Sequence, residues 1–198
     1  MRGPIAAILL CSAVLGLTPS TCLAGRAAPT VLTAGASNSA KDSQIYSTIK
    51  DLMESMIDPS ADVLWGAAGS VLDKEGVHDL APKTQGEWLD VRRAAVRIIE
   101  GGNLLMMPGR DAAPAGTKSD APGVELEPPQ ITALIRRKRK EFNAFAKALQ
   151  ALGLEALHAT EAKNTDLLIE IGGRMEDVCE SCHKTFWYPQ AKSAATRN

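Results

Sequence analysis

Apolar residues recur at spacings of three and four along most of the chain after residue 43, which predicts amphipathic helices. A first helix is expected from residue 43 to residue 72. We expect a kink or restart at Asp58, because Asp58 can cap a helix and Pro59 suits a first turn but not a helix interior. Its apolar face is formed by Ile45, Ile49, Leu52, Met53, Met56, Ile57, Val63, Leu64, Ala67, Ala68, Val71 and Leu72.

Three more helices follow, separated by segments of loop composition. The second begins at Thr84, which forms a capping box with Glu87, and ends near Met107. The third starts after residues 127–130 and stops at Gly153, and the fourth runs from about residue 155 to beyond His183.

The loops are expected at residues 73–83 and 108–126. Few segments alternate with period two, so no strand is expected. The pattern therefore predicts an all-α fold, and an antiparallel four-helix bundle is its natural architecture.

The N-terminus has the layout of a secretory signal peptide. Arg2 precedes an apolar run that is too short for the roughly 20 residues of a membrane span. We expect residues 1–24 to be removed on export to the periplasm, residues 25–42 to form a flexible leader and residues 189–198 a C-terminal tail. A membrane anchor, or a lipoprotein attached through Cys22, remains an alternative; otherwise the mature chain has no membrane span.

The cysteines are the most informative residues of the chain. Four are encoded, but Cys11 and Cys22 fall in the signal region, so the mature protein keeps Cys179 and Cys182. With His183 they occupy positions i, i+3 and i+4, which share one face of a helix. C-x-x-C-H is the attachment signature of a c-type haem, in which both thiols form thioethers and the histidine Nε2 binds the iron. The motif therefore predicts one covalent haem c with its iron.

Other uses of the motif fit less well. A zinc site needs four ligands, and only His78 and His158 remain as further histidines, neither in a paired spacing. A thioredoxin-like redox pair needs a βαβ context, whereas this context is helical. A chance occurrence of the motif is a further alternative.

The position of the motif at the end of the last helix, and the match of residues 179–186 to C-x-x-C-H-x-x-F with Phe186 as the aromatic residue, resemble the class II cytochromes c, the cytochrome c′ superfamily. The resemblance covers residues 43–188. It implies an up-down-up-down bundle with haem in its interior and a function in electron transfer or gas binding. The chain departs from the family at Trp187, where an arginine is common, and in its longer loop 108–126.

The distal iron ligand is a second expectation from the resemblance. In the low-spin branch of the family it is a methionine early in the first helix, within a Leu-Met pair, and Leu52-Met53 resembles that pair. Met53 is therefore the expected distal ligand. Met56, Met106 and Met107 are alternatives, as is an open distal side, and all four methionines could be core residues.

The expected function is one-electron transfer between redox partner proteins, since no side-chain set in the mature chain resembles the site of a hydrolase or transferase. The alternatives are a five-coordinate haem protein that binds NO or CO, and a non-haem helical interaction module. The net charge of −1 does not suggest nucleic acid. The basic run 136–140 is either a solvated helix face or a docking patch for an acidic redox partner, and a homodimer is compatible with the pattern.

Overall fold

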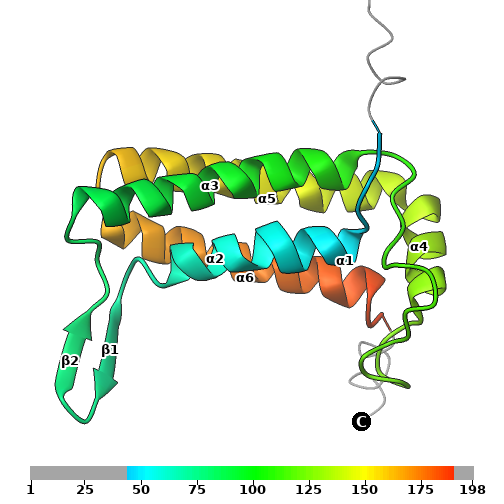
Figure 1. Cartoon of the computed structure of the whole chain (residues 1–198), viewed down its shortest axis with the longest axis horizontal. Coiled ribbons are helices and arrows are strands. Elements are labelled where there is room, and N and C mark those ends of the chain that lie inside the picture. The colour runs from blue at the N-terminus through cyan, green and yellow to red at the C-terminus, as the bar shows by residue number, and fades with distance from the viewer. Residues whose placement is uncertain (1–43, 190–198) are drawn as a thin grey trace, which may run out of the picture. The chain divides into compact units, whose positions relative to one another are not determined.

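The computed structural model describes residues 44–189, which are mostly helical and include one small antiparallel hairpin (Figure 1). The elements, in chain order, are α1 (Ile49–Leu52), η2 (Met53–Ile57), α2 (Asp58–Trp65), β1 (Ser70–Asp73), β2 (Gly76–Asp79), α3 (Gln85–Met106), α4 (Pro128–Arg137), α5 (Arg139–Glu161) and α6 (Thr165–Phe186).

The first helical rod is continuous but changes its winding. Thr48 caps α1: its hydroxyl accepts from the Asp51 amide, while the Asp51 carboxylate accepts from the Thr48 amide. η2 is a π-helical turn, and α2 follows it with Pro59 in its first turn. The rod begins at Ile49 rather than at residue 43. The expected change at Asp58 is confirmed in part: the winding changes there, but the rod is not interrupted and Asp58 is not the N-cap of α2. Proline has no amide hydrogen to continue the preceding ladder, which explains why the winding changes there.

The prediction that this helix continues to Leu72 is wrong, and so is the prediction of a plain loop at 73–83. The helix ends at Trp65, and the chain turns at Gly69, whose φ of 86° favours glycine. β1 then pairs with β2, with Leu72 opposite Val77. The hairpin projects from the helices (Figure 1), and Leu72 and Val77 are 77% and 72% exposed. Each strand has only four residues, which is too few for an alternating pattern to be recognised in the sequence. The spacing of Val71 and Leu72 therefore predicted a helix instead of a strand.

The second helix is confirmed as α3, including the capping box of Thr84 and Glu87. The segment between α3 and α4 contains no helix and no named strand, as expected for loop 108–126.

The third and fourth helices differ from their predicted bounds. A break at Lys138 divides the third helix into α4 and α5. α5 passes through Gly153 and ends at Glu161, so the predicted stop at Gly153 and the predicted start of the next helix near residue 155 are both wrong. The actual turn follows at Lys163, with a φ of 52°, and α6 is capped by the side chain of Asn164.

Gly153 is buried within α5 because α3 packs closely against it. A β-carbon at Gly153 would lie 2.9 Å from the Ile98 side chain and 3.0 Å from that of Ile99. The residue that resembled a helix stop is therefore a contact point between two long helices.

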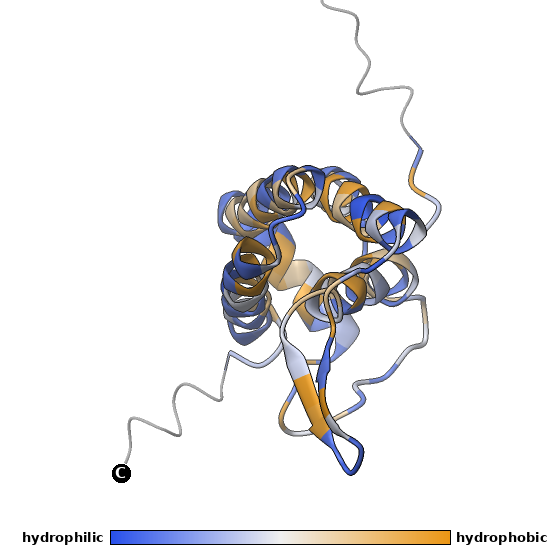
Figure 2. Ribbon diagram, turned by 90° about the vertical axis from the view of Figure 1, so that its left-hand side faces the viewer, coloured by the Kyte–Doolittle hydropathy of each residue, from blue (hydrophilic) through white to orange (hydrophobic). Residues whose placement is uncertain are grey.

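Apolar side chains from α1–α2, α3, α5 and α6 form one core, and the helices run side by side around it (Figures 1 and 2). Near the end of α6 the core is aromatic, with the rings of Phe142 and Phe186 edge to face at 5.4 Å between centroids.

Within residues 44–189, no helix combines the length and hydropathy needed to cross a membrane. The predicted signal peptide and leader, residues 1–42, and residues 190–198 of the predicted tail lie outside the described residues.

We expect Gly153→Ala to lower the free energy of unfolding by about 1–3 kcal/mol, because the added methyl group overpacks the α3–α5 contact. Gly173→Ala is the matched control, since no atom lies within 4 Å of a β-carbon there and alanine is a better helix former than glycine by roughly 1 kcal/mol. Chemical denaturation of both variants tests the contact. Equal stabilisation by the two substitutions would contradict it.

Candidate functional site

Cys179, Cys182 and His183 line one cavity of about 390 Å³, which we call the thiol cavity. This volume lies within the range of roughly 300–1,000 Å³ for small-molecule sites. α6 presents the three side chains at adjacent positions of one face, as their spacing predicts. Met53, from η2, lines the same cavity.

The remaining walls of the thiol cavity are largely apolar and come from every long helix. Aliphatic and aromatic side chains provide them, namely Ile57, Ala61, Trp65, Leu105, Phe142, Phe145, Ala146, Leu149 and Val178. The indole Nε1 of Trp65 donates to the Gly172 carbonyl at 3.1 Å, which fixes α2 against α6. Trp88 is buried in the core, whereas Trp65 is partly exposed.

Burial disfavours charge on the sulfur and nitrogen atoms of the site. It is the main reason that the pKa of the Cys182 thiol is raised to about 12, and it also raises the pKa of Cys179, with a further contribution from Asp58. Burial likewise lowers the pKa of His183. Near neutral pH the site therefore presents two thiols and a neutral imidazole, the form of histidine that binds metals.

A second hollow of about 230 Å³ lies between η2, α6 and the loop 107–127, and we call it the loop cavity. Met53 and His183 line both hollows. The ring of Trp187 lies edge-on to that of His183, with 5.7 Å between centroids. The His183 side chain thus lies between the thiol cavity and the loop cavity and borders both.

The loop 107–127 is tied to the elements that border His183. Its carbonyl groups at Asp111 and Ala112 accept from the first amides of α1, at 2.9 Å each, and the Leu126 amide donates to the Trp187 carbonyl at 2.8 Å. Orphan donors at the start of α1 are thereby satisfied. The loop therefore connects α1 to the end of α6.

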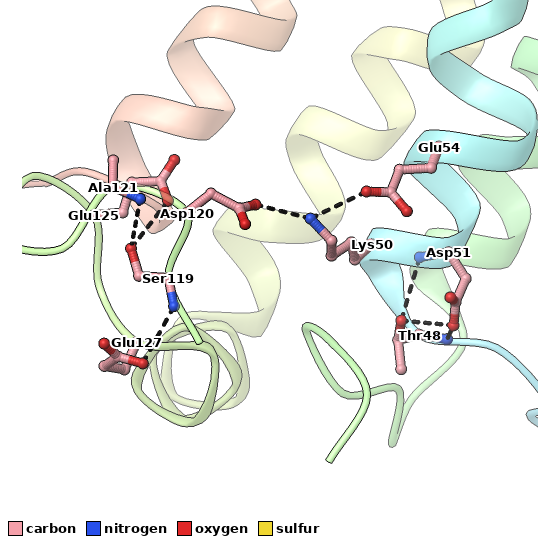
Figure 3. A network of polar contacts seen from close by, with 9 residues as sticks. All are labelled: Thr48, Lys50, Asp51, Glu54, Ser119, Asp120, Ala121, Glu125 and Glu127. Carbon is pink, nitrogen blue, oxygen red and sulfur yellow. Dashed lines mark hydrogen bonds and ion pairs between the residues drawn. The ribbon is translucent and has the colours of Figure 1, made fainter. Parts of the chain in front are cut away.

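Side chains reinforce this connection (Figure 3). Lys50 Nζ lies 2.9 Å from Asp120 and 3.0 Å from Glu54, and these contacts raise its pKa to about 12. Ser119 donates to Glu125 at 3.2 Å and accepts from the Ala121 amide. The loop covers the His183 end of the bundle with an ordered set of contacts.

The other methionines lie elsewhere. Met56 and Met106 pack against the core, and the sulfur of Met107 accepts from Arg110 at 3.6 Å. None of the three lines the thiol cavity, so of the four methionines proposed from the sequence only Met53 shares a cavity with His183.

The remaining histidines are remote from the motif. His158 is exposed in the last turn of α5. His78 is exposed on β2 and bonds to Asp73 at 2.9 Å. Asp73, Glu75 and His78 could bring three ligand atoms within 4.8 Å of one another, a grouping that the sequence did not reveal because the hairpin was not expected.

Three carboxylates at the thiol cavity were also missed. Asp58, Glu176 and Glu180 line it. Glu176 lies three residues before Cys179 and Glu180 three before His183, a spacing that places them beside the motif on α6, whereas nothing local in the sequence brings Asp58 to the same place. The basic run 136–140 does not line the cavity; Arg136 pairs with Asp111, and Arg139 donates to the Leu105 and Met107 carbonyls at the end of α3.

Comparisons with protein-family models, with curated proteins and with solved structures find no match to this chain. The site offers two thiols, an imidazole and a thioether around an apolar space. Sulfur and imidazole nitrogen atoms are ligands for soft or intermediate metals, and the apolar walls suit a large apolar group that carries such a metal.

In reduced protein with free thiols, we expect alkylation of Cys179 and Cys182 at pH 8 to be at least about tenfold slower in the native state than in urea. The thiolate is the reactive form, and the raised pKa values keep its fraction low until the pH approaches them. The rate should rise with pH throughout the range from 7 to 9. Equal native and denatured rates, followed by mass spectrometry, would contradict the burial of these thiols.

Proposed function

We propose that this chain is an exported monohaem c-type cytochrome that transfers single electrons. The observation that supports it most strongly is that the two thiols and the imidazole of a C-x-x-C-H motif, together with one methionine sulfur, line a single apolar cavity. A metal or redox site made of the two thiols alone would not need that space.

The residues present fit a covalent haem c. Cys179 and Cys182 would hold it through thioethers, His183 would be the proximal iron ligand and Met53 the distal ligand. The group would supply an iron that alternates between Fe(II) and Fe(III).

The chain's own contribution is to bind, orient and exclude water. The aliphatic and aromatic walls keep the surroundings of the ligands dry, and the neutral imidazole of His183 offers a nitrogen lone pair. A thioether is a soft, neutral ligand that favours Fe(II) and raises the reduction potential relative to a second histidine. The ordered loop 107–127 limits access of solvent to the His183 side.

The proposed architecture is the antiparallel up-down-up-down four-helix bundle of the class II cytochromes c, with the first rod, α3, α4–α5 and α6 as its four helices. The proposed location is the periplasm, since attachment of haem to C-x-x-C-H takes place outside the cytoplasm and the N-terminus has a signal-peptide layout.

The experiment that tests the function is an optical spectrum of the exported protein in both redox states, with a pyridine haemochrome assay. We expect a low-spin c-type spectrum that changes reversibly with reduction. A colourless protein would overturn the proposal and favour a non-haem interaction module. A high-spin spectrum, with prompt and tight CO binding by the ferrous protein, would instead favour the gas-binding alternative.

The assignment of Met53 is tested separately. Met53→Ala should convert the haem from low-spin to high-spin, open the distal side to CO and lower the midpoint potential, because the sulfur ligand is lost. Met56→Ala is the matched control, and we expect no spectral change beyond a loss of stability of at most about 2–5 kcal/mol. Spectroscopy should also detect the weak near-infrared charge-transfer band of sulfur on ferric iron. Its survival in Met53→Ala, with loss in Met106→Ala or Met107→Ala, would move the ligand to the end of α3.

A further inference from the structure

Charge is unevenly distributed over the helices. The first rod carries Asp51, Glu54, Asp58 and Asp62 against Lys50, and α6 carries Asp166, Glu170, Glu176, Asp177 and Glu180 against Arg174 and Lys184. The segment of α4, Lys138 and α5 has the opposite balance: Arg136, Arg137, Lys138, Arg139, Lys140 and Lys147 against Glu141, Glu155 and Glu161. The near-neutral net charge of −1 therefore conceals two oppositely charged faces.

Acidic side chains of the first rod and α6 lie at the thiol cavity. Asp58 and Glu176 line the cavity and are exposed, and Glu180 lines it from the next turn of α6. Asp62 is exposed one turn beyond Asp58 on α2. We call these four residues the acidic rim.

Most of this charge is not neutralised by neighbouring cations. Glu180 pairs with Lys184 at 2.9 Å and accepts from Tyr188. No ion pair within residues 44–189 involves Asp58, Asp62 or Glu176. Within the described residues, the thiol cavity is thus lined by two carboxylates without an ion pair, Asp58 and Glu176, and the unpaired Asp62 is exposed one turn from Asp58.

We infer that the acidic rim is the docking surface for a redox partner protein that carries a basic patch. The inference rests on the proposed function, since electron exchange requires the partner to approach the opening of the cofactor cavity, and tunnelling weakens steeply with distance. Charges of one sign around an opening attract partners of the opposite sign and raise association rates by about 10–10³. The basic run 136–140, which lines no part of the cavity, is then a solvated face rather than the site of electron exchange.

The acidic rim also excludes other partners. Anionic membranes, nucleic acids and acidic proteins would be repelled from the opening at low ionic strength. A transient redox encounter needs only a small interface, so that long-range attraction to the rim, rather than a large apolar contact, is sufficient to orient the partner.

Binding of a fluorescent deca-lysine peptide to the haem-loaded protein tests the surface directly. We expect binding at low salt that weakens steeply as salt is added. Neutralisation in the triple variant Asp58→Asn, Asp62→Asn, Glu176→Gln should weaken it about tenfold. The matched control removes the same number of charges elsewhere, in Asp90→Asn, Glu100→Gln, Glu161→Gln. Equal effects of the two triple variants would overturn the inference.

Oxidation of the ferrous protein by small reagents of opposite charge tests whether electrons leave through the rim. The rate with tris(phenanthroline)cobalt(III), a cation, should fall with ionic strength, and the rate with ferricyanide, an anion, should rise. Both slopes should flatten in the rim variant and not in the control. If the rate with the cation rose with ionic strength and the rate with the anion fell, in a protein with a normal haem spectrum, the docking surface alone would be refuted. A colourless protein would refute the proposed function and this inference together.

Discussion

An apolar cavity within the helical body, lined by every long helix, is the constraint on which the other features of this protein depend. Side chains from the first rod, α3, α5 and α6 line this space of about 390 Å³, so its shape depends on how all the long helices pack. An apolar group bound there would contact every one of these helices. The proposed haem thus has a structural as well as a chemical role.

The position of the cavity follows from local features of each helix. The change of winding at η2 brings Met53 and Ile57 to the same cavity as Asp58, and Trp65 holds α2 to α6 through its bond to Gly172. Gly153 lets α3 and α5 approach closely farther along the bundle. The helices are therefore in tight contact near Gly153, whereas the side chains of the C-x-x-C-H motif line an open space.

Sequence reasoning succeeded where the signal was local and repeated. The capping box of Thr84 and the shared face of Cys179, Cys182 and His183 follow from spacings of three or four residues, and the change of winding at Asp58 follows from the identity of Pro59. It failed where tertiary contacts decide. Gly153 has the identity of a helix stop, but α3 packs on it. Val71 and Leu72 continue a helical spacing, but Gly66 and Gly69 turn the chain into a hairpin. The acidic rim was missed because it joins two helices that are far apart in the sequence.

The thiol cavity is bordered by negative charge, which could not be inferred from the net charge of the chain or from its basic run 136–140. Carboxylates of α2 and α6 line the thiol cavity, whereas the basic run 136–140 of α4 and α5 does not. The position of the acidic rim is therefore determined by the fold and not by the order of charged residues along the chain.

The central claim is that Cys179 and Cys182 attach haem covalently, and peptide mapping of the exported protein tests it most directly. Trypsin should release residues 175–184, which follow Arg174 and end at Lys184. The account predicts that this peptide carries one haem, absorbs visible light and has no thiol that can be alkylated after reduction. The same peptide with two free thiols or a disulfide, from protein exported by a host that attaches haem to other cytochromes, would contradict it.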